Sequence, residues 1–341
     1  MNNPGLIEYQ EQLLKCFKTD PKITGLALCK MIDNILKHPR NNDVVRVLID
    51  ALQPCTSKET DSKLYDMNGR EIVTLEDEIG VGSYADIFGC SYNGQSAVLK
   101  VPLLSHMDDA DYGTDAVIID FAREAVINIV LHFLQARAHQ CYDISPQYTT
   151  IPTPYLLLKE ASTGVPTTLV YIYERLDYTM AQILPPLAPR YGLILCLQFV
   201  LAVYYMQMAF GNFTHFNSTL TNIMVKKYPK PVMFTVTLHD NFKFTVPIEY
   251  GVYFIDFNLS CLEVTKCIEF TQLPDARYGA DWKNCSDKAL DLHMFFKDIT
   301  EMQPPLHKDI VAFATEQNNQ PHTELTPYTV IKRLVKVLKL V

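Results

Sequence analysis

Polar residues interrupt apolar segments of this chain at positions where each side chain needs a partner. Lys100 ends the apolar run Ala97-Val98-Leu99, and a lysine in an apolar strand is costly to bury unless an anion meets it. Upstream, Gly80-Val81-Gly82-Ser83 lies between two expected strands. Glycines at such a turn let backbone N–H groups approach phosphate oxygens. These residues point to a phosphate site, although a solvated lysine and an ordinary hairpin turn are the plainer alternatives.

Further polar positions could complete such a site. Glu124 lies on the helix expected after the lysine strand and is the only glutamate between Glu78 and Glu160. Three more candidates follow along the chain: the segment His215-Phe216-Asn217-Ser218-Thr219-Leu220-Thr221-Asn222, the segment Ile255-Asp256-Phe257-Asn258 after apolar Tyr253-Phe254, and Asp291 near an expected helix start. A surface glutamate, an aspartate at a strand end and an aspartate at a helix N-terminus are the alternatives for single positions.

In this order, the motifs resemble those of the eukaryotic-type protein kinase superfamily. The kinase catalytic loop reads H-R-D-L-x-x-x-N, and His215 and Asn222 stand at the matching spacing. The resemblance implies an ATP site in which Lys100 meets Glu124 and the phosphates, while Asn222 and Asp256 hold Mg²⁺. It further implies a phosphate-binding turn (Gly80, Gly82, Ser83), an adenine-binding hinge (Tyr173-Glu174-Arg175-Leu176) and an aspartate, Asp291, that ties down the catalytic-loop backbone.

The chain departs from the kinase pattern at several positions. Asn217 stands where kinases have the catalytic aspartate, and a neutral amide cannot take up a proton near pH 7. Thr219 replaces the phosphate-contacting lysine of many Ser/Thr kinases. Phe216 replaces the arginine that reads an activation-loop phosphate, which predicts no switching by phosphorylation there. Ala85 and Asn258 replace glycines, which are milder changes.

Three functions stay open at this point. The first is an ATP-binding protein with weak or specialised Ser/Thr phosphotransfer, since general-base assistance is worth ~10²–10⁴ in rate. The second is a pseudokinase that serves as a binding or scaffold module. The third is an interaction protein that binds no nucleotide and uses its N-terminal helices as a docking surface. Asn217 is the residue that separates the first two.

A long segment between Asn222 and Asp256 is distinctive. Residues 226–254 are expected to form a β-hairpin that turns near His239-Asp240-Asn241. This insert, and the absence of an A-P-E motif after Asp256, is similar to haspin-like kinases and to kinase-like proteins of large nucleocytoplasmic DNA viruses. The resemblance covers residues 71 to about 300. It implies a cytoplasmic protein, located in the host cytoplasm or the virion if the protein is viral.

The elements that must position these residues follow from periodicity. Strands are predicted at EIVTLEDEI, ADIFGCSY and QSAVLKVPL, with a turn at Asn93-Gly94, and again at TTLVYIYERL. A helix is predicted over 116–138, and helices dominate beyond Leu187. We therefore expect an α+β, two-lobed protein-kinase-like fold. It comprises a helical extension (1–65) ending in a polar linker (53–63), a strand-rich N-lobe (66–175) and a mainly helical C-lobe (176–341).

Charge and composition indicate which classes of binding partner to expect. A net charge of −8 gives no general attraction to nucleic acid or anionic membranes. Nine cysteines without C-x-x-C pairs indicate reduced thiols, and the N-terminus lacks the pattern of a secretory signal. Residues 191–215 carry no charge and are long enough to cross a bilayer. Gln198, Gln207 and the polar loop that follows favour a buried helix, so neither a membrane nor a nucleic-acid partner is expected.

Overall fold

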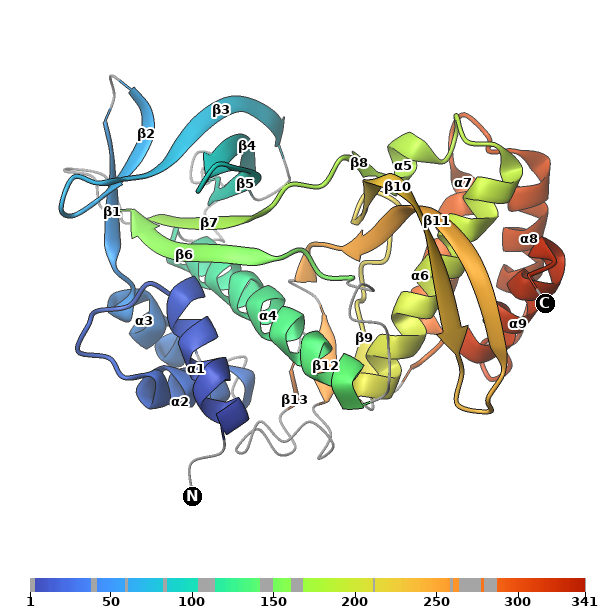
Figure 1. Ribbon diagram of the computed structural model, residues 1–341, viewed down its shortest axis with the longest axis horizontal. Coiled ribbons are helices and arrows are strands. Elements are labelled where there is room, and N and C mark those ends of the chain that lie inside the picture. Colours follow the sequence, from blue (N-terminus) through green and yellow to red (C-terminus); the bar gives the residue numbers. More distant parts are fainter. Residues whose placement is uncertain are drawn as a thin grey trace. The chain divides into compact units, whose positions relative to one another are not determined.

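The computed structural model describes residues 4–37, 42–58, 61–81, 85–103, 114–141, 150–160, 168–210, 212–257, 260–263, 277–278 and 287–340. Strands and helices fall largely in separate runs, so the molecule is of the predicted α+β class (Figure 1). The chain divides into two compact units. The described part of the first comes from Met1–Phe133 and Pro152–Arg175, and that of the second from Leu134–Ile151, Leu176–Glu269 and Leu273–Val341.

A closed β-barrel forms the centre of the first unit. Its strands are β1 (Pro54–Lys58), β2 (Asp61–Asp66), β3 (Glu71–Val81), β4 (Ala85–Tyr92), β5 (Gln95–Pro102), β6 (Pro154–Glu160) and β7 (Thr168–Glu174). They close in the order β1-β2-β3-β4-β5-β7-β6. Asn93 and Gly94, with φ of 52° and 75°, join β4 to β5 in the left-handed conformation that a two-residue hairpin turn needs. The predicted strands and this turn are confirmed, whereas closure into a barrel was not predicted.

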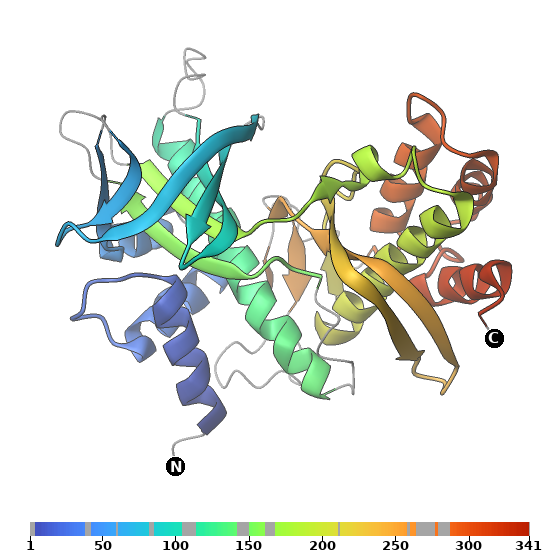
Figure 2. The ribbon, with the colours of Figure 1, turned by 45° about the horizontal axis from the view of Figure 1, so that its top comes forward.

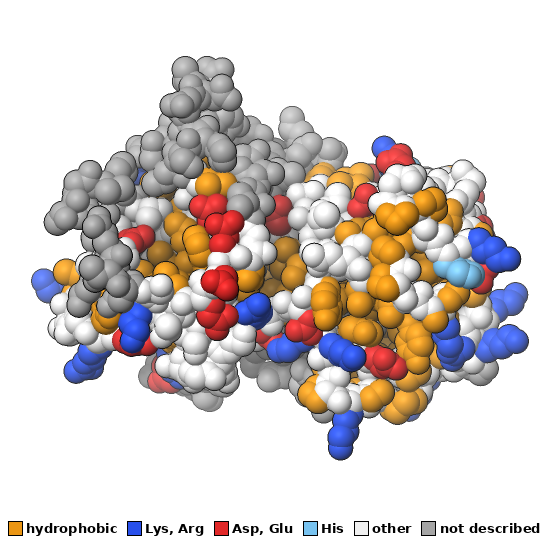
Figure 3. All heavy atoms as spheres, turned by 90° about the horizontal axis from the view of Figure 1, so that it is seen from above, with side chains coloured by type: hydrophobic (Ala, Val, Ile, Leu, Met, Phe, Trp, Pro, Cys, Tyr) orange, Lys and Arg blue, Asp and Glu red, His pale blue; other side chains and the backbone are white. Residues whose placement is uncertain are grey.

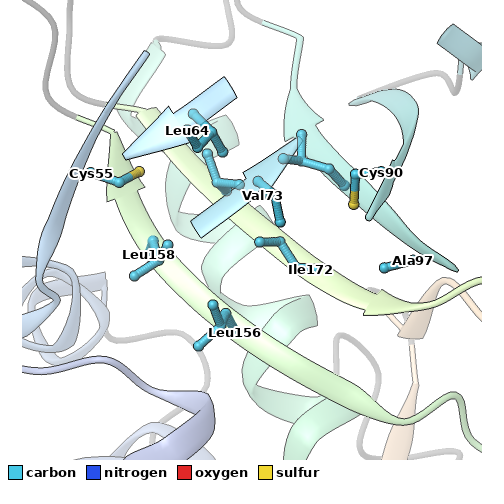
Figure 4. Close-up of a cluster of buried hydrophobic side chains, with 10 residues drawn as sticks. Cys55, Leu64, Val73, Cys90, Ala97, Leu156, Leu158 and Ile172 are labelled. Atoms are coloured by element: carbon cyan, nitrogen blue, oxygen red, sulfur yellow. The ribbon is translucent and has the colours of Figure 1, made fainter. Parts of the chain in front are cut away.

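Alternate side chains of these strands fill the barrel (Figure 4). The buried cluster consists of Cys55, Leu64, Val73, Cys90, Ala97, Leu99, Leu156, Leu158, Val170 and Ile172. Burial raises the pKa of the Cys55 and Cys90 thiols to about 12, so both are neutral core residues. Successive side chains of a strand point to opposite faces. Lys100 therefore leaves β5 on the face opposite Leu99, where it meets helix α4 (Thr114–Cys141).

The N-terminal helices belong to the first unit. They are α1 (Pro4–Cys16), α2 (Gly25–Lys37) and α3 (Asn42–Ala51), and they lie together beside β6 (Figures 1 and 2). Their apolar faces are almost fully buried, with exposures of 0–1% at Leu13, Phe17, Leu28, Ile32, Ile35, Val45 and Leu48. Phe17 also forms a parallel β-bridge with Leu157 of β6. Leu157 is buried on the face of β6 opposite Leu156 and Leu158, which fill the barrel. The helices therefore pack against the outer face of the barrel.

The predicted polar linker over residues 53–63 is wrong. Pro54–Lys58 and Asp61–Asp66 are barrel strands, and the helices end at Ala51. These strands are held by backbone pairing to each other, to β3 and to β6. Backbone pairing needs no apolar side chains. Only Cys55 and Leu64 of these strands enter the core, so the apolar alternation that marks a strand in sequence is missing.

Acidic side chains account for much of the charge on the first unit. Glu76, Asp77 and Glu78 of β3 are exposed, and acidic side chains are visible over this unit in Figure 3. Arg175 donates to Glu76 Oε2 at 2.9 Å, so part of this charge is compensated locally.

Helix α6 (Pro189–Phe210) is the core of the second unit. Over Pro189–Met208 it is long and apolar enough to cross a membrane, but 89% of its most apolar window is buried inside the structure. The prediction of a buried helix here is confirmed. Around it lie α5 (Met180–Ile183), α7 (Leu290–Glu301), α8 (Lys308–Asn318), α9 (Pro327–Leu338) and the short strands β8 (Tyr178–Thr179), β9 (Asn212–Thr214), β12 (Cys261–Glu263) and β13 (Arg277–Tyr278).

The predicted hairpin is confirmed as β10 (Ile223–Thr237) and β11 (Lys243–Phe254). Its tip is fixed to helices of the same unit. Tyr204 of α6 bonds His239 through its hydroxyl at 2.9 Å, and both Tyr328 and Lys332 of α9 donate to Asp240. At its base, Ile223 pairs with Phe254. This pairing places Asn222, just before β10, close to Ile255, just after β11.

Candidate functional site

The first candidate group is an ion pair within the first unit. Lys100 Nζ lies 2.7 Å from Oε1 and 2.8 Å from Oε2 of Glu124 on α4. The side chains are only 15% and 12% exposed, so removing one partner would leave a poorly solvated charge. Asp120, one turn earlier on α4, instead pairs with Arg123 at 2.5 Å. The structure thus brings Lys100 and Glu124 together.

The glycine-rich turn is described only in part. Gly80 lies in β3 opposite Ile87 of β4. Among the described residues, nothing lies within 4 Å of the position that a Cβ on Gly80 would take. Gly80 also lacks the positive φ of Gly69 and Gly94. Neither packing nor backbone conformation of the described part therefore demands glycine at this position. Gly82 and Ser83 lie outside the described residues.

The predicted hinge lies where the chain passes from one unit to the other. Arg175 is the last residue of its segment in the first unit, and Leu176 begins the second. The Glu174 backbone N–H donates to Thr153 O at 2.9 Å, and its carboxylate accepts from Thr153 N at 3.1 Å and Oγ1 at 3.0 Å. The Leu176 side chain is buried. Glu174 is thus fixed to the residue that precedes β6.

A second candidate group lies within the second unit. Asn217 Nδ2 donates to Asp256 Oδ2 at 3.2 Å, although the residues are 39 positions apart. Asn222 Nδ2 donates to the backbone oxygen of Asn217 at 3.1 Å, and Ile255 N donates to Asn222 O at 3.1 Å. Asn217, Asn222 and Asp256 therefore form one hydrogen-bonded group, which we call the amide–carboxylate group.

Helix α7 holds the loop that carries this group. Asp291, 1% exposed in the first turn of α7, accepts from His215 N at 2.8 Å, Phe216 N at 3.1 Å and Ser218 Oγ at 2.8 Å. Two turns later, Asp298 Oδ2 accepts from Leu220 N at 2.6 Å. The loop backbone is therefore bonded to two carboxylates of a single rigid helix.

His215 ties the loop to the segment that contains Asp256. Its Nε2 lies 2.9 Å from Ile255 O, and because a carbonyl oxygen accepts, Nε2 carries the hydrogen. The ring contacts the aromatic rings of Phe254 and Phe257. Burial lowers the pKa of His215 to about 4, so the ring is neutral near pH 7. A neutral, fully buried imidazole is suited to a structural role here.

Burial has the opposite effect on Asp291. It raises the pKa of the carboxyl to about 6, against the hydrogen bonds from His215, Ser218 and Phe216, which favour the charged form. Near pH 7 the carboxylate is ionised and accepts all three hydrogen bonds. The charge on this hydrogen-bond acceptor therefore changes near pH 6.

The side chains of Asn222 and Asp256 limit the kind of metal site that this unit can form. In the part of the chain that the structure describes, no group of at least three His, Cys, Asp or Glu could hold a metal ion. Asp256 would offer one carboxylate, and Asn222, whose Nδ2 donates to Asn217 O, would offer an amide oxygen. Mg²⁺ commonly takes one or two such ligands together with waters and phosphate oxygens. The residues therefore fit Mg²⁺ bound with a phosphate ligand, and they do not fit an all-protein cage.

Two residues that hold the candidate groups, Asp298 and Thr153, were not predicted from the sequence. Asp298 carries no motif, and a partly exposed aspartate on a helix gives no sign that it bonds Leu220. Thr153, whose N–H donates to the Glu174 carboxylate, precedes strand β6, which was not predicted from the sequence. A helix register that places Asp291 and Asp298 on one face was the available signal for Asp298.

No protein-family model matches the chain, and no curated protein matches it.

Proposed function

We propose that this chain is a two-lobed, protein-kinase-like protein that binds ATP with Mg²⁺. The Lys100–Glu124 ion pair carries the proposal. A lysine that leaves an apolar strand and is oriented by a glutamate of the following helix matches the kinase arrangement that presents an ammonium group to phosphates. Two further observations support it. The resemblance implies that Asp291 ties down the loop backbone, and Asp291 accepts from His215 N. It also implies that Asn222 and Asp256 act together, and both belong to the amide–carboxylate group.

The roles of the residues follow from this assignment. Lys100 would pair with the nucleotide phosphates while Glu124 fixes its ammonium group. Asn222 and Asp256 would hold Mg²⁺, which neutralises phosphate charge when bound. Gly80, Gly82 and Ser83 would supply the phosphate-binding turn. Glu174 and Leu176 would contact adenine through backbone groups.

Asn217 limits the chemistry that such a site can perform. Its Nδ2 donates to Asp256, so its Oδ1 is oriented to accept a hydrogen bond from another donor, such as a substrate hydroxyl. An amide oxygen can orient that hydroxyl but cannot remove its proton at neutral pH. We therefore propose weak or specialised Ser/Thr phosphotransfer, since kinase catalysis depends mainly on positioning and electrostatics.

Thermal unfolding with Mg-ATP tests nucleotide binding. ATP at 100 times its dissociation constant stabilises a protein by about 2.7 kcal/mol, which raises the Tm by several degrees. Wild type and Lys63→Ala should show this shift, and Lys100→Ala should lose most of it. Lys63 is a matched control because it also pairs with a glutamate, Glu71, from a barrel strand. Equal shifts in the Lys100 and Lys63 variants would contradict the proposal.

A pseudokinase is the second candidate, and the neutral residue at position 217 favours it. Restoring the carboxylate by Asn217→Asp separates the two functions. If phosphotransfer is the function, wild type transfers phosphate measurably and the variant is faster by up to ~10²–10⁴. If the chain is a binding module, wild type shows no transfer above a Lys100→Ala background. Wild-type phosphotransfer that exceeds the Lys100→Ala background and equals that of the Asn217→Asp variant would count against the pseudokinase.

A further inference from the structure

The side-chain amide of Asn217 lies beside the carboxylate of Asp256. Its Nδ2 contacts Asp256 Oδ2 at 3.2 Å, and the Asn217 backbone oxygen accepts from Asn222. Asn217 thus bonds to both of the other members of the group. A hydrogen bond to a carboxylate is stronger than one between neutral groups.

This bond supports an unfavourable backbone conformation. Asp256 has φ of 64° and Phe216 has φ of 62°, a region that residues other than glycine rarely occupy. Such conformations persist only where surrounding contacts determine them. Asp291 bonds the N–H of Phe216, and Asn217 bonds the side chain of Asp256. Asn217 therefore holds Asp256 from the loop side, with contacts made entirely by this chain.

We infer that Asn217 takes the place of a divalent cation as the partner that fixes Asp256, so that the loop 215–222 and the segment 254–257 keep their geometry without a cation. The inference rests on the proposed assignment of Asp256 as a cation ligand. An aspartate at position 217 would replace the hydrogen bond with two close carboxylates. Like charges at that separation repel strongly where water is partly excluded, and a cation bound between them would relieve this repulsion.

Cation dependence of the Asn217→Asp variant tests this inference in the full chain without nucleotide. We expect wild type to have the same Tm in EDTA and in millimolar Mg²⁺. The variant should melt about 4 °C or more below wild type in EDTA and recover most of that loss in Mg²⁺. Asn241→Asp is the matched control, because Asn241 is exposed, has φ of 62° and lies in the same unit. It should show no recovery beyond that of wild type.

Hydrogen–deuterium exchange of wild type adds a local readout that does not depend on any variant. Peptides covering 215–222 and 254–257 should exchange equally in EDTA and in Mg²⁺. Strong protection of these peptides by Mg²⁺ alone would overturn the inference, as would an Asn217→Asp variant with wild-type stability in EDTA. These experiments contain no ATP. If only the inference about Asn217 is wrong, Mg-ATP still raises the Tm of wild type. If the proposed function is wrong, Mg-ATP does not raise that Tm.

Discussion

At the scale of single residues, the chemistry of the second unit depends on which groups are charged. Asn217 is neutral at any pH, and His215 is neutral because it is buried. Asp291 is the buried carboxylate on which the loop depends, and burial raises its pKa toward 6. Burial therefore shifts the pKa values of His215 and Asp291 in opposite directions. Their effects on stability should oppose each other in mildly acidic solution.

We predict that Asp291→Asn makes stability depend more steeply on pH. The pKa of Asp291 rises from 3.8 to about 6 on folding, so its contribution is present below pH 3.8 and is lost as pH rises to about 6. The pKa of His215 falls from 6.5 to about 4, so its contribution is present above pH 6.5 and is lost as pH falls. Between these limits the two slopes oppose each other in wild type, and only the His215 slope remains in the variant.

Urea unfolding at several pH values between 4.5 and 6.5 measures this effect. The free energy of unfolding of Asp291→Asn should rise with pH by up to about 1.4 kcal/mol per pH unit relative to wild type. His215→Phe, which keeps only the Asp291 contribution, should change in the opposite direction. Parallel pH profiles for wild type and both variants would show that these groups do not have the shifted pKa values described.

At the scale of elements, helix α7 and the β10–β11 hairpin determine the geometry of the site. The hairpin could be predicted from its alternating sequence and turn residues, and strands β3, β4 and β5 likewise. The hydrogen bond from Asn217 to Asp256 could not, because it depends on how a loop packs against a strand end 39 residues away. Strands β1 and β2 were missed because backbone pairing, rather than an apolar pattern, places them in the barrel.

Helix α7 yields a prediction about Asp298. Asp298→Ala should lower the free energy of unfolding by about 1–3 kcal/mol, because it leaves the N–H of buried Leu220 without its acceptor. Glu301→Ala on the same helix is the control, since its partner Lys297 lies 3.8 Å away and both are exposed. It should change stability by about 0.5 kcal/mol or less. Equal effects of the two variants in thermal or urea unfolding would exclude an anchoring role for Asp298.

At the scale of the whole molecule, the N-terminal helices are integral to the first unit. Their apolar faces pack inward, and Arg123, next to Glu124 on α4, donates to Asn42 of α3 at 3.2 Å. The helical character of residues 4–51 was predictable from periodicity. Their burial was not, because an amphipathic pattern does not identify the surface that it packs against.

We predict that the first unit is strongly destabilised once the packing of these helices is disrupted. Phe17→Ala should cost about 3–5 kcal/mol, because the side chain is fully buried at the point where the chain backbone is bridged to β6. Leu26→Ala, at a position 48% exposed on α2, should cost far less. Hydrogen exchange of the barrel strands, used to monitor unfolding, measures the stability loss in each of these two variants. Equal, small effects would mean that the helices are an appended module available for docking.

The claim that Lys100 meets the phosphates of ATP has a direct test. An acyl-phosphate derivative of ATP transfers its acyl group to a lysine amine held beside the terminal phosphate, and mass spectrometry identifies the modified lysine. We predict that Lys100 is acylated and that excess Mg-ATP suppresses this modification, while exposed Lys63 and Lys336 show no suppression. Modification of Lys100 that Mg-ATP does not reduce, or none at Lys100, would contradict the account.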